Sequence, residues 1–93
     1  MISLVNGVVR SISLDKVIVE VGGVGLSLAI AQKTSAHLNI GVQVQLFTTL
    51  VVREDALTLY GFLEDGDRAL FELVQTVSGI GPKVALSIVS ALS

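Results

Sequence analysis

The residues best suited to chemistry lie near the end of the chain, where positions 78–83 have the sequence Ser-Gly-Ile-Gly-Pro-Lys. Glycine leaves the backbone uncovered and accepts unusual conformations, so several N–H groups can point outward together. At the start of a helix, such unpaired N–H groups and the helix dipole favour an anion. Lys83 adds a flexible positive charge, and a nucleic-acid phosphate is the natural ligand. The residues predicted to bind DNA phosphates are Ser78, Gly79, Ile80, Gly81 and Lys83.

This spacing has the form of a helix-hairpin-helix motif, in which we expect Ile80 to point inward and hold the turn rigid. Such a motif binds the DNA backbone without recognising its sequence, because every nucleotide carries the same phosphate. On these residues alone a second interpretation stays open. The segment can equally be a plain turn between two helices that happens to contain two glycines.

A second candidate site is the acidic pair Glu54 and Asp55, at the predicted tip of a β-hairpin spanning residues 51–62. At a turn, both carboxylates can project into solvent. Two carboxylates can bind Mg²⁺, but a metal nuclease site normally gathers carboxylates from several elements. The residues alone therefore favour a solvated acidic turn over a metal site.

The usual signatures of an enzyme are missing from the sequence. His37 is the single histidine and there is no cysteine, so neither a zinc site nor a disulfide framework can be assembled. No P-loop occurs, and the Gly-x-Gly pairs at 23–25 and 79–81 lack the third glycine of a dinucleotide fingerprint. Nothing resembles a Ser-His-Asp constellation. We predict no catalytic residue, no metal ligand and no cofactor.

Two kinds of structure are expected to position these candidate sites. Up to residue 62, short stretches of alternating apolar and polar residues are separated by turn residues, which favours a small barrel or sandwich. Gly7 interrupts the first stretch and is interpreted as a bulge or tight bend. The strands are expected around residues 2–9, 17–21, 26–30, 42–47, 50–53 and 57–62.

From Glu64 onward the pattern is helical. Apolar residues at 70, 71, 74 and 77 define one face of a first helix, with Asp65 or Asp67 as its N-cap. Pro82 occupies the first position expected for a second helix, where proline is favoured. That helix has an apolar face from Val84 to Leu92, and we expect this face to find no partner within the chain.

The composition indicates an ordered protein that associates with a partner, but its charge argues against DNA binding. Of the 93 residues, 52% are hydrophobic and only 15% are charged, with a mean hydropathy of +0.82, which excludes disorder and favours association with a partner. No membrane span is expected, since polar residues interrupt the longest charge-free stretch. The absence of cysteine fits a cytoplasmic protein. The net charge of −2 argues against DNA binding, because nucleic-acid binders are usually basic.

Taken together, these motifs resemble the N-terminal part of the RuvA family of bacterial proteins that bind Holliday junctions. The similar segments, in order, are Met1-Ile2 with Gly7, then residues 18–25 (IVEVGGVG), 51–56 (VVREDA), 59–62 (LYGF), 70–71 (LF) and 78–83 (SGIGPK). The matching segments span nearly the whole chain, which makes the resemblance specific.

The resemblance implies an all-β OB-fold barrel over residues 1–63 followed by an α-helical segment, residues 64–93, that is the first helix-hairpin-helix of a truncated DNA-binding domain. A second hairpin and a C-terminal domain that engages the RuvB ATPase would follow. The implied assembly is a homotetramer that holds a four-way DNA junction open and flat, near the bacterial nucleoid, while RuvB moves the arms. The RuvC resolvase is a candidate further partner.

The resemblance also assigns Glu54 and Asp55 to the acidic pin of the family, four copies of which stand near the junction centre. Carboxylates there would repel strand phosphates and disfavour a continuous duplex. Two alternatives stay open. One is a generic helix-hairpin-helix module of a repair enzyme, which binds duplex DNA without preferring junctions. The other is an assembly domain that binds no DNA.

Overall fold

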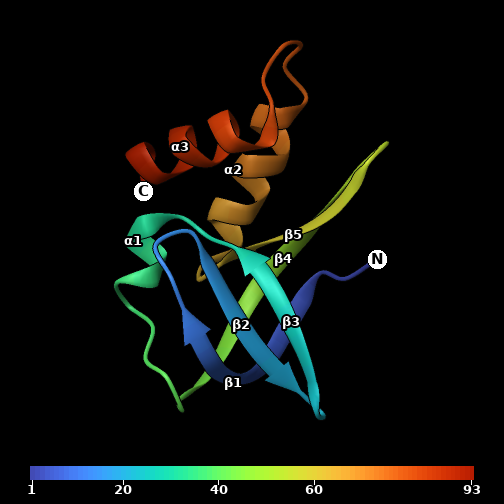
Figure 1. The fold of residues 1–93 in the computed structure, drawn as a ribbon. Coiled ribbons are helices and arrows are strands. Elements are labelled where there is room, and N and C mark those ends of the chain that lie inside the picture. Colours follow the sequence, from blue (N-terminus) through green and yellow to red (C-terminus); the bar gives the residue numbers. More distant parts are fainter.

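Five strands close into a barrel, and two helices lie against one side of it, in the computed structural model, which describes residues 1–93 (Figure 1). The strand order around the barrel is β1-β2-β3-β5-β4, and β4 pairs with β1 to complete the circle. Only the β3–β5 pair is parallel. The elements are β1 (Leu4–Ile12), β2 (Lys16–Val21), β3 (Val24–Ala29), α1 (Gln32–Ser35), β4 (Gln43–Arg53), β5 (Ala56–Phe62), α2 (Asp65–Gln75) and α3 (Pro82–Leu92). This architecture confirms the predicted OB-type barrel followed by helices.

The barrel interior is filled by branched aliphatic side chains. Successive strand residues point to opposite faces, so every second residue of β1 and β2 enters the core. β-Branched residues suit this pleated, half-buried surface. The buried residues of this core are Val5, Val9, Val17, Val19, Leu28, Ile30, Leu38, Leu46 and Leu59.

Gly7 lies within regular strand pairing, so the prediction of a bulge or bend at this glycine is wrong. The register shift of β1 falls between Val9 and Ser11 instead. A β-carbon at position 7 would collide with the carbonyl oxygen of Glu20 and lie 2.9 Å from side-chain atoms of Val19 and Val21. Glycine is therefore required here by the close approach of β2 and not by a turn.

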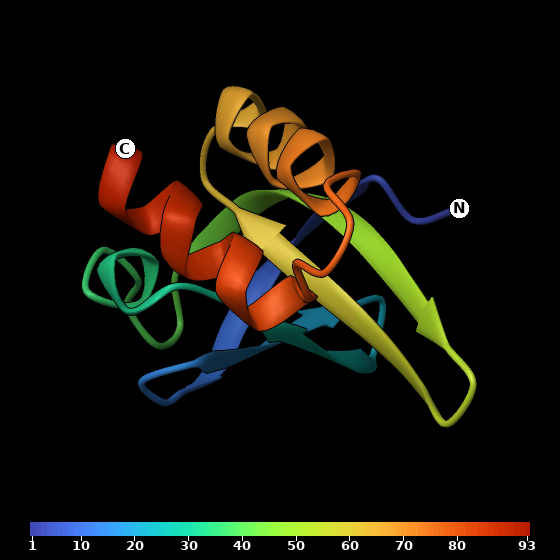
Figure 2. The ribbon, with the colours of Figure 1, turned by 90° about the horizontal axis from the view of Figure 1, so that it is seen from above.

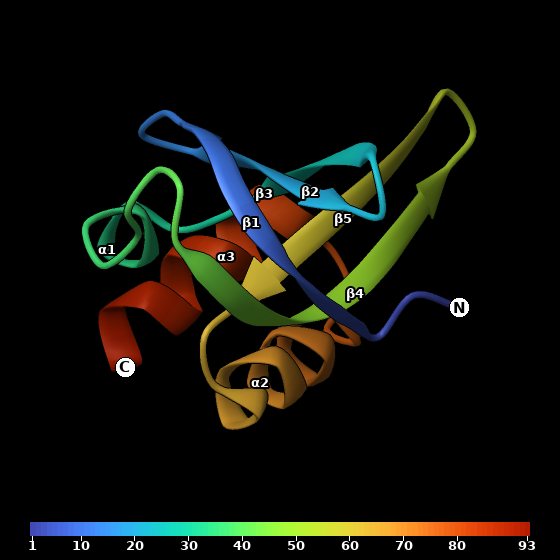
Figure 3. The same cartoon turned by 90° about the horizontal axis from the view of Figure 1, so that it is seen from below.

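Strand β4 runs without a break through 11 residues, although the sequence predicted two separate strands over this range. Phe47 pairs with Phe62 and Thr48 with Gly61, so the ladder with β5 continues across the expected gap. The C-terminal part of β4 and the N-terminal part of β5 extend beyond the barrel as a projecting two-stranded arm (Figures 2 and 3). This arm ends in the turn that contains the acidic pair.

A second core joins the helices to the barrel. Tyr60 and Phe62 of β5 contact Phe71 of α2, with ring centroids 4.9 and 5.2 Å apart. Ala85 and Val89 of α3 are buried in the same cluster. The prediction that the apolar face of the second helix lacks a partner is therefore wrong for half of that face.

The other half of that face does stay open, with Val84 and Leu92 exposed by 55% and 70%. The helix is apolar on two sides, and the barrel covers only one of them. None of the three helices is long and apolar enough to cross a membrane.

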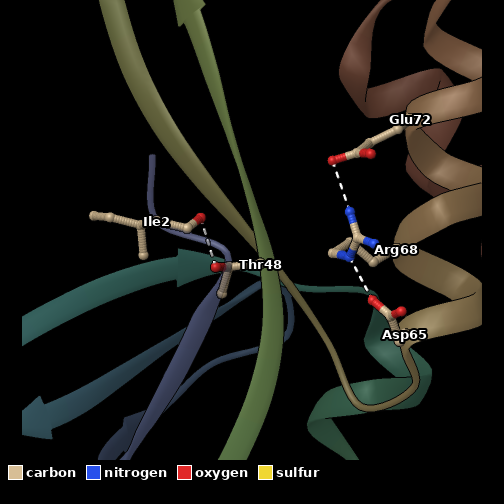
Figure 4. A network of polar contacts seen from close by, with 5 residues as sticks. All are labelled: Ile2, Thr48, Asp65, Arg68 and Glu72. Atoms are coloured by element: carbon tan, nitrogen blue, oxygen red, sulfur yellow. Dashed lines mark hydrogen bonds and ion pairs between the residues drawn. The ribbon is translucent and has the colours of Figure 1, made fainter.

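The first turn of α2 is organised by an arginine and not by the predicted aspartate cap. Glu64 occupies the N-cap position, and no side chain caps the helix. Asp65 lies inside the first turn, where its carboxylate accepts a hydrogen bond of 2.6 Å from Arg68 Nε. Arg68 Nη1 lies 2.9 Å from Glu72, so one guanidinium bridges two turns (Figure 4). These contacts raise the pKa of Arg68, and the main cause is the hydrogen bond that Arg68 donates to Asp65.

One buried polar side chain ties the N-terminus to the barrel. The Thr48 hydroxyl donates to the carbonyl oxygen of Ile2 at 2.9 Å (Figure 4). The backbone N–H of Thr48 donates to the carbonyl oxygen of Ser3 at the same distance. Thr48 is only 1% exposed, so both contacts satisfy groups that burial would otherwise leave without water.

Candidate nucleic-acid interface

The turn between α2 and α3 presents free backbone N–H groups at the start of a helix. Gly79 adopts a φ of +85°, a left-handed conformation that residues with a β-carbon rarely accept. Gly81 is the N-cap of α3, without any side-chain cap. The backbone N–H groups of Gly79, Gly81, Lys83 and Val84 make no hydrogen bond to the backbone of the chain. Such a turn is chemically suited to an anion.

The predicted phosphate-binding residues divide into an outer and an inner group. Ser78, Gly79 and Lys83 are exposed. Ile80 is half-buried and packs against the aromatic core, and Gly81 is half-buried beside it. The side chain of Ile80 therefore anchors the turn while its neighbours face solvent.

The acidic pair lies at the end of the projecting arm. Arg53 pairs with Ala56, so Glu54 and Asp55 form a two-residue turn, and both are exposed. Neither carboxylate takes part in an ion pair or hydrogen bond. The chain nowhere gathers three or more histidine and carboxylate side chains in a group that could hold a metal ion. The tip is therefore a pair of free negative charges.

The arm and the helical turn project from the same end of the molecule (Figure 1). Arg53 connects them: its Nη2 atom lies 4.0 Å from the position that a β-carbon on Gly81 would occupy. The positive charge of Arg53 thus lies next to both the acidic tip and the glycine turn.

Sequence reasoning did not single out Arg53, although strand alternation contained the signal. Arg53 shares a face of the arm with Val51 and Tyr60, and both of these pack against the helices. Burial raises the pKa of Tyr60, and the positive charge of Arg53 opposes this rise. Because Val51 and Tyr60 face the helices, Arg53 on the same face of the arm points toward the turn between α2 and α3.

The positive side chains of the chain fall into two sets of three. In the first set, Arg10 pairs with Glu20 at 3.0 Å, Arg68 bridges Asp65 and Glu72, and Lys33 donates to carbonyl oxygens near the end of α3. The second set makes no ion pair or side-chain hydrogen bond and consists of Lys16, Arg53 and Lys83.

These three unpaired cations lie around the N-terminal end of α3. Lys16 and Lys83 line one pocket there, and Arg53 stands beside Gly81. A chain with a net charge of −2 therefore still gathers three unpaired cations around one end of α3, which weakens the objection that its composition raised.

Comparison with known proteins agrees with the resemblance found in the motifs. Residues 1–61 match the family model described as RuvA N terminal domain. The chain is 51% identical over 90 residues to the Holliday junction branch migration complex subunit RuvA of Salinispora arenicola, covering 97% of this chain and 45% of that protein. It is 50% identical over 93 residues to the protein of the same name from Acidothermus cellulolyticus, covering 100% and 47%.

A third relative with this name, from Streptomyces coelicolor, is 48% identical over 85 residues, which are 91% of this chain and 42% of that protein. The chain thus spans slightly less than half the length of these relatives. The family model covers the barrel strands, and the relatives extend the similarity through both helices. The chain belongs to the RuvA N-terminal domain family.

Proposed function

We propose that this chain binds four-way DNA junctions in a structure-specific and sequence-independent way, as part of a branch-migration subunit. The observation that carries the proposal is the arrangement at one end of the molecule. A glycine turn with free N–H groups and unpaired cations lies beside an arm that ends in two free carboxylates. The names of the relatives agree with this function.

The glycine turn supplies the attraction. Its N–H groups, with Ser78 and Lys83, hold the phosphates of one arm of the junction, and none of these groups distinguishes one base from another. Ile80 and the aromatic core behind it keep the turn in place. Affinity therefore depends on salt, because each phosphate contact releases counterions.

The acidic tip accounts for the preference for four-way junctions over continuous duplex DNA. Glu54 and Asp55 repel any phosphate brought close to them, and this repulsion strengthens where DNA and protein exclude water. A continuous duplex across the tip meets the repulsion, whereas an open junction has a gap at its centre. Preference for junctions thus arises from a penalty on the competing ligand.

We further propose that four copies assemble around the junction. Leu73 of α2 and Val77, which follows the end of this helix, are 65% and 54% exposed and lie four residues apart, so they form an apolar strip that a neighbouring copy would cover. Residues 1–63 act as the barrel domain of each copy and residues 64–93 as its first DNA-binding hairpin.

The chain is not proposed to be an enzyme by itself. The RuvB ATPase would supply the motor, through a domain outside this chain, and the RuvC resolvase is a candidate partner at the same junction. Branch migration by this complex would take place on chromosomal DNA in the bacterial cytoplasm.

A competition assay tests the proposal. A labelled four-way junction is bound by the chain and then challenged with excess linear duplex at fixed salt. We expect the junction complex to survive, and we expect Glu54→Gln with Asp55→Asn to tighten duplex binding about tenfold, equivalent to about 1.4 kcal/mol. Equal competition by duplex for the unaltered chain would contradict junction preference, and unchanged duplex affinity in the double variant would contradict the repulsive role.

A further inference from the structure

A pocket of about 370 Å³ opens between the N-terminal half of α3, strand β5 and the start of β2. Its apolar wall is formed by Ala29, Ile30 and Leu86. Its polar groups come from the β1–β2 turn, β2, β5 and α3 and are Asp15, Lys16, Thr58, Tyr60 and Lys83. Apart from Lys83, none of these polar residues belongs to the glycine turn or to the acidic tip.

Four of the five polar groups have no partner in the chain. The side chains of Lys16, Thr58, Tyr60 and Lys83 take part in none of its side-chain hydrogen bonds or ion pairs. Asp15 accepts a long hydrogen bond of 3.5 Å from the Ser13 hydroxyl. Two ammonium groups and two hydroxyls that face one pocket without partners form a set of donors for an anion.

Charge narrows the class of anion. The two lysines and the single carboxylate give the pocket lining a net charge of +1. Burial raises the pKa of Tyr60, so its hydroxyl stays protonated and able to donate near neutral pH. A phosphodiester carries a single negative charge and several acceptor oxygens, which matches this lining better than a multiply charged anion.

We propose that this pocket binds a backbone phosphate of the DNA strand held at the α2–α3 turn, with Lys16, Thr58, Tyr60 and Lys83 as its donors. The inference rests on the proposed function and extends it. Lys83 belongs both to the glycine turn and to the pocket lining, so the strand continues from the helical turn onto the barrel. The barrel is then a direct part of the DNA-binding surface and not only its support.

Salt titrations of junction binding test this pocket. Lys16→Gln should lower the slope of log affinity against log salt by about 0.9, the value for one lost phosphate contact. Tyr60→Phe keeps the ring that packs 4.9 Å from Phe71 and should weaken binding about threefold to tenfold without changing the slope. Arg10→Gln is the matched control, because it removes one positive charge from a β1 residue that already pairs with Glu20 of β2.

The outcomes separate this inference from the proposed function. If the unaltered chain binds junctions and the Lys16 and Tyr60 variants bind like the Arg10 control, the pocket is overturned and the proposed function stands. If the unaltered chain binds no DNA, the proposed function fails, and NMR titration with dimethyl phosphate then decides on the pocket. Shifts confined to Lys16, Thr58 and Tyr60 would support the phosphodiester site, and their absence would overturn it.

Discussion

The barrel and the helical hairpin are held together by different means. The barrel closes on itself through backbone hydrogen bonds between strands, and its core contains only valine, leucine and isoleucine. The helices are joined to it by side chains, above all by the contacts of Phe71 with Tyr60 and Phe62. The glycine turn thus depends on a small aromatic core that the barrel does not need for its own closure.

The largest expected effect comes from breaking this aromatic core. Phe71 is fully buried, and Phe71→Ala should lower the free energy of unfolding by about 3–5 kcal/mol, because the cavity removes contacts from both helices and β5. Urea denaturation followed by circular dichroism measures this loss. NMR spectra should show that β-barrel signals persist while those of α2 and α3 broaden.

Val84→Ala is the control for this experiment, because Val84 lies on α3 beside the buried Ala85 and is 55% exposed. Its effect should stay within about 0.5 kcal/mol. If Phe71→Ala unfolded barrel and helices in one transition with all signals lost together, the two regions would form a single cooperative unit.

A smaller effect should distinguish the two glycines of the turn. Gly79→Ala places a β-carbon on a backbone with a φ of +85° and should destabilise the protein by about 1–2 kcal/mol. Gly81 has a φ of −82°, and the nearest atom to an added β-carbon is 4.0 Å away, so Gly81→Ala meets no strain or clash and should cost only about 0.5–1 kcal/mol, because alanine is a poorer N-cap than glycine. Thermal melts compare the two variants.

Junction binding adds a second readout to this pair. Both alanine variants should bind junctions more weakly, Gly79→Ala through a distorted turn and Gly81→Ala because its methyl group hinders phosphate approach. A folded Gly81→Ala variant with unchanged affinity would show that phosphates do not approach this residue.

The smallest expected effect concerns Arg53, which connects the arm to the helical turn. Tyr60 is the only tyrosine, so tyrosinate absorbance reports its ionisation directly. Because the charge of Arg53 lowers the pKa of Tyr60, Arg53→Gln should raise that pKa further above the ordinary value of 10.0. Stability should be unchanged near neutral pH. A pKa that did not move would place the guanidinium away from Tyr60.

The sign of the tyrosine effect on stability follows from the same shift. The folded chain binds the tyrosine proton more tightly than the unfolded chain does, since the pKa of Tyr60 is raised on folding. Its contribution to stability is therefore fully present below pH 10 and is lost as the pH rises through the folded pKa. Tyr60→Phe should remove the part of the decrease in unfolding free energy at high pH that comes from ionisation of Tyr60.

Patterns of single elements were predictable from the sequence, whereas contacts between elements were not. Strand alternation and Pro82 at the start of α3 identified the fold class correctly. The role of Gly7 was missed because it depends on how closely β2 approaches β1, which local sequence does not encode. The N-terminus of α2 was misassigned because Arg68 competes for the carboxylate of Asp65.

The candidate site divides in the same way. The glycine turn and the acidic pair are contiguous in sequence, and motif reasoning was enough to single them out. Arg53 and Lys16 reach the neighbourhood of α3 only through the closure of the barrel, which brings β5 beside β3 and the start of β2 beside α3. Identifying them required the tertiary structure.

The parallel pairing of β3 with β5 has a consequence for the order of folding. It joins Leu28 to Leu59 and Ala29 to Tyr60, partners 31 residues apart in the chain. Contacts so distant in sequence form late, because the intervening segment must first lose its conformational freedom. Tyr60 also belongs to the aromatic core, so the strand pair and the docking of the helices share this residue. A newly synthesised chain would therefore place its glycine turn late in folding, and under the proposed function partly folded chains would not occupy junctions.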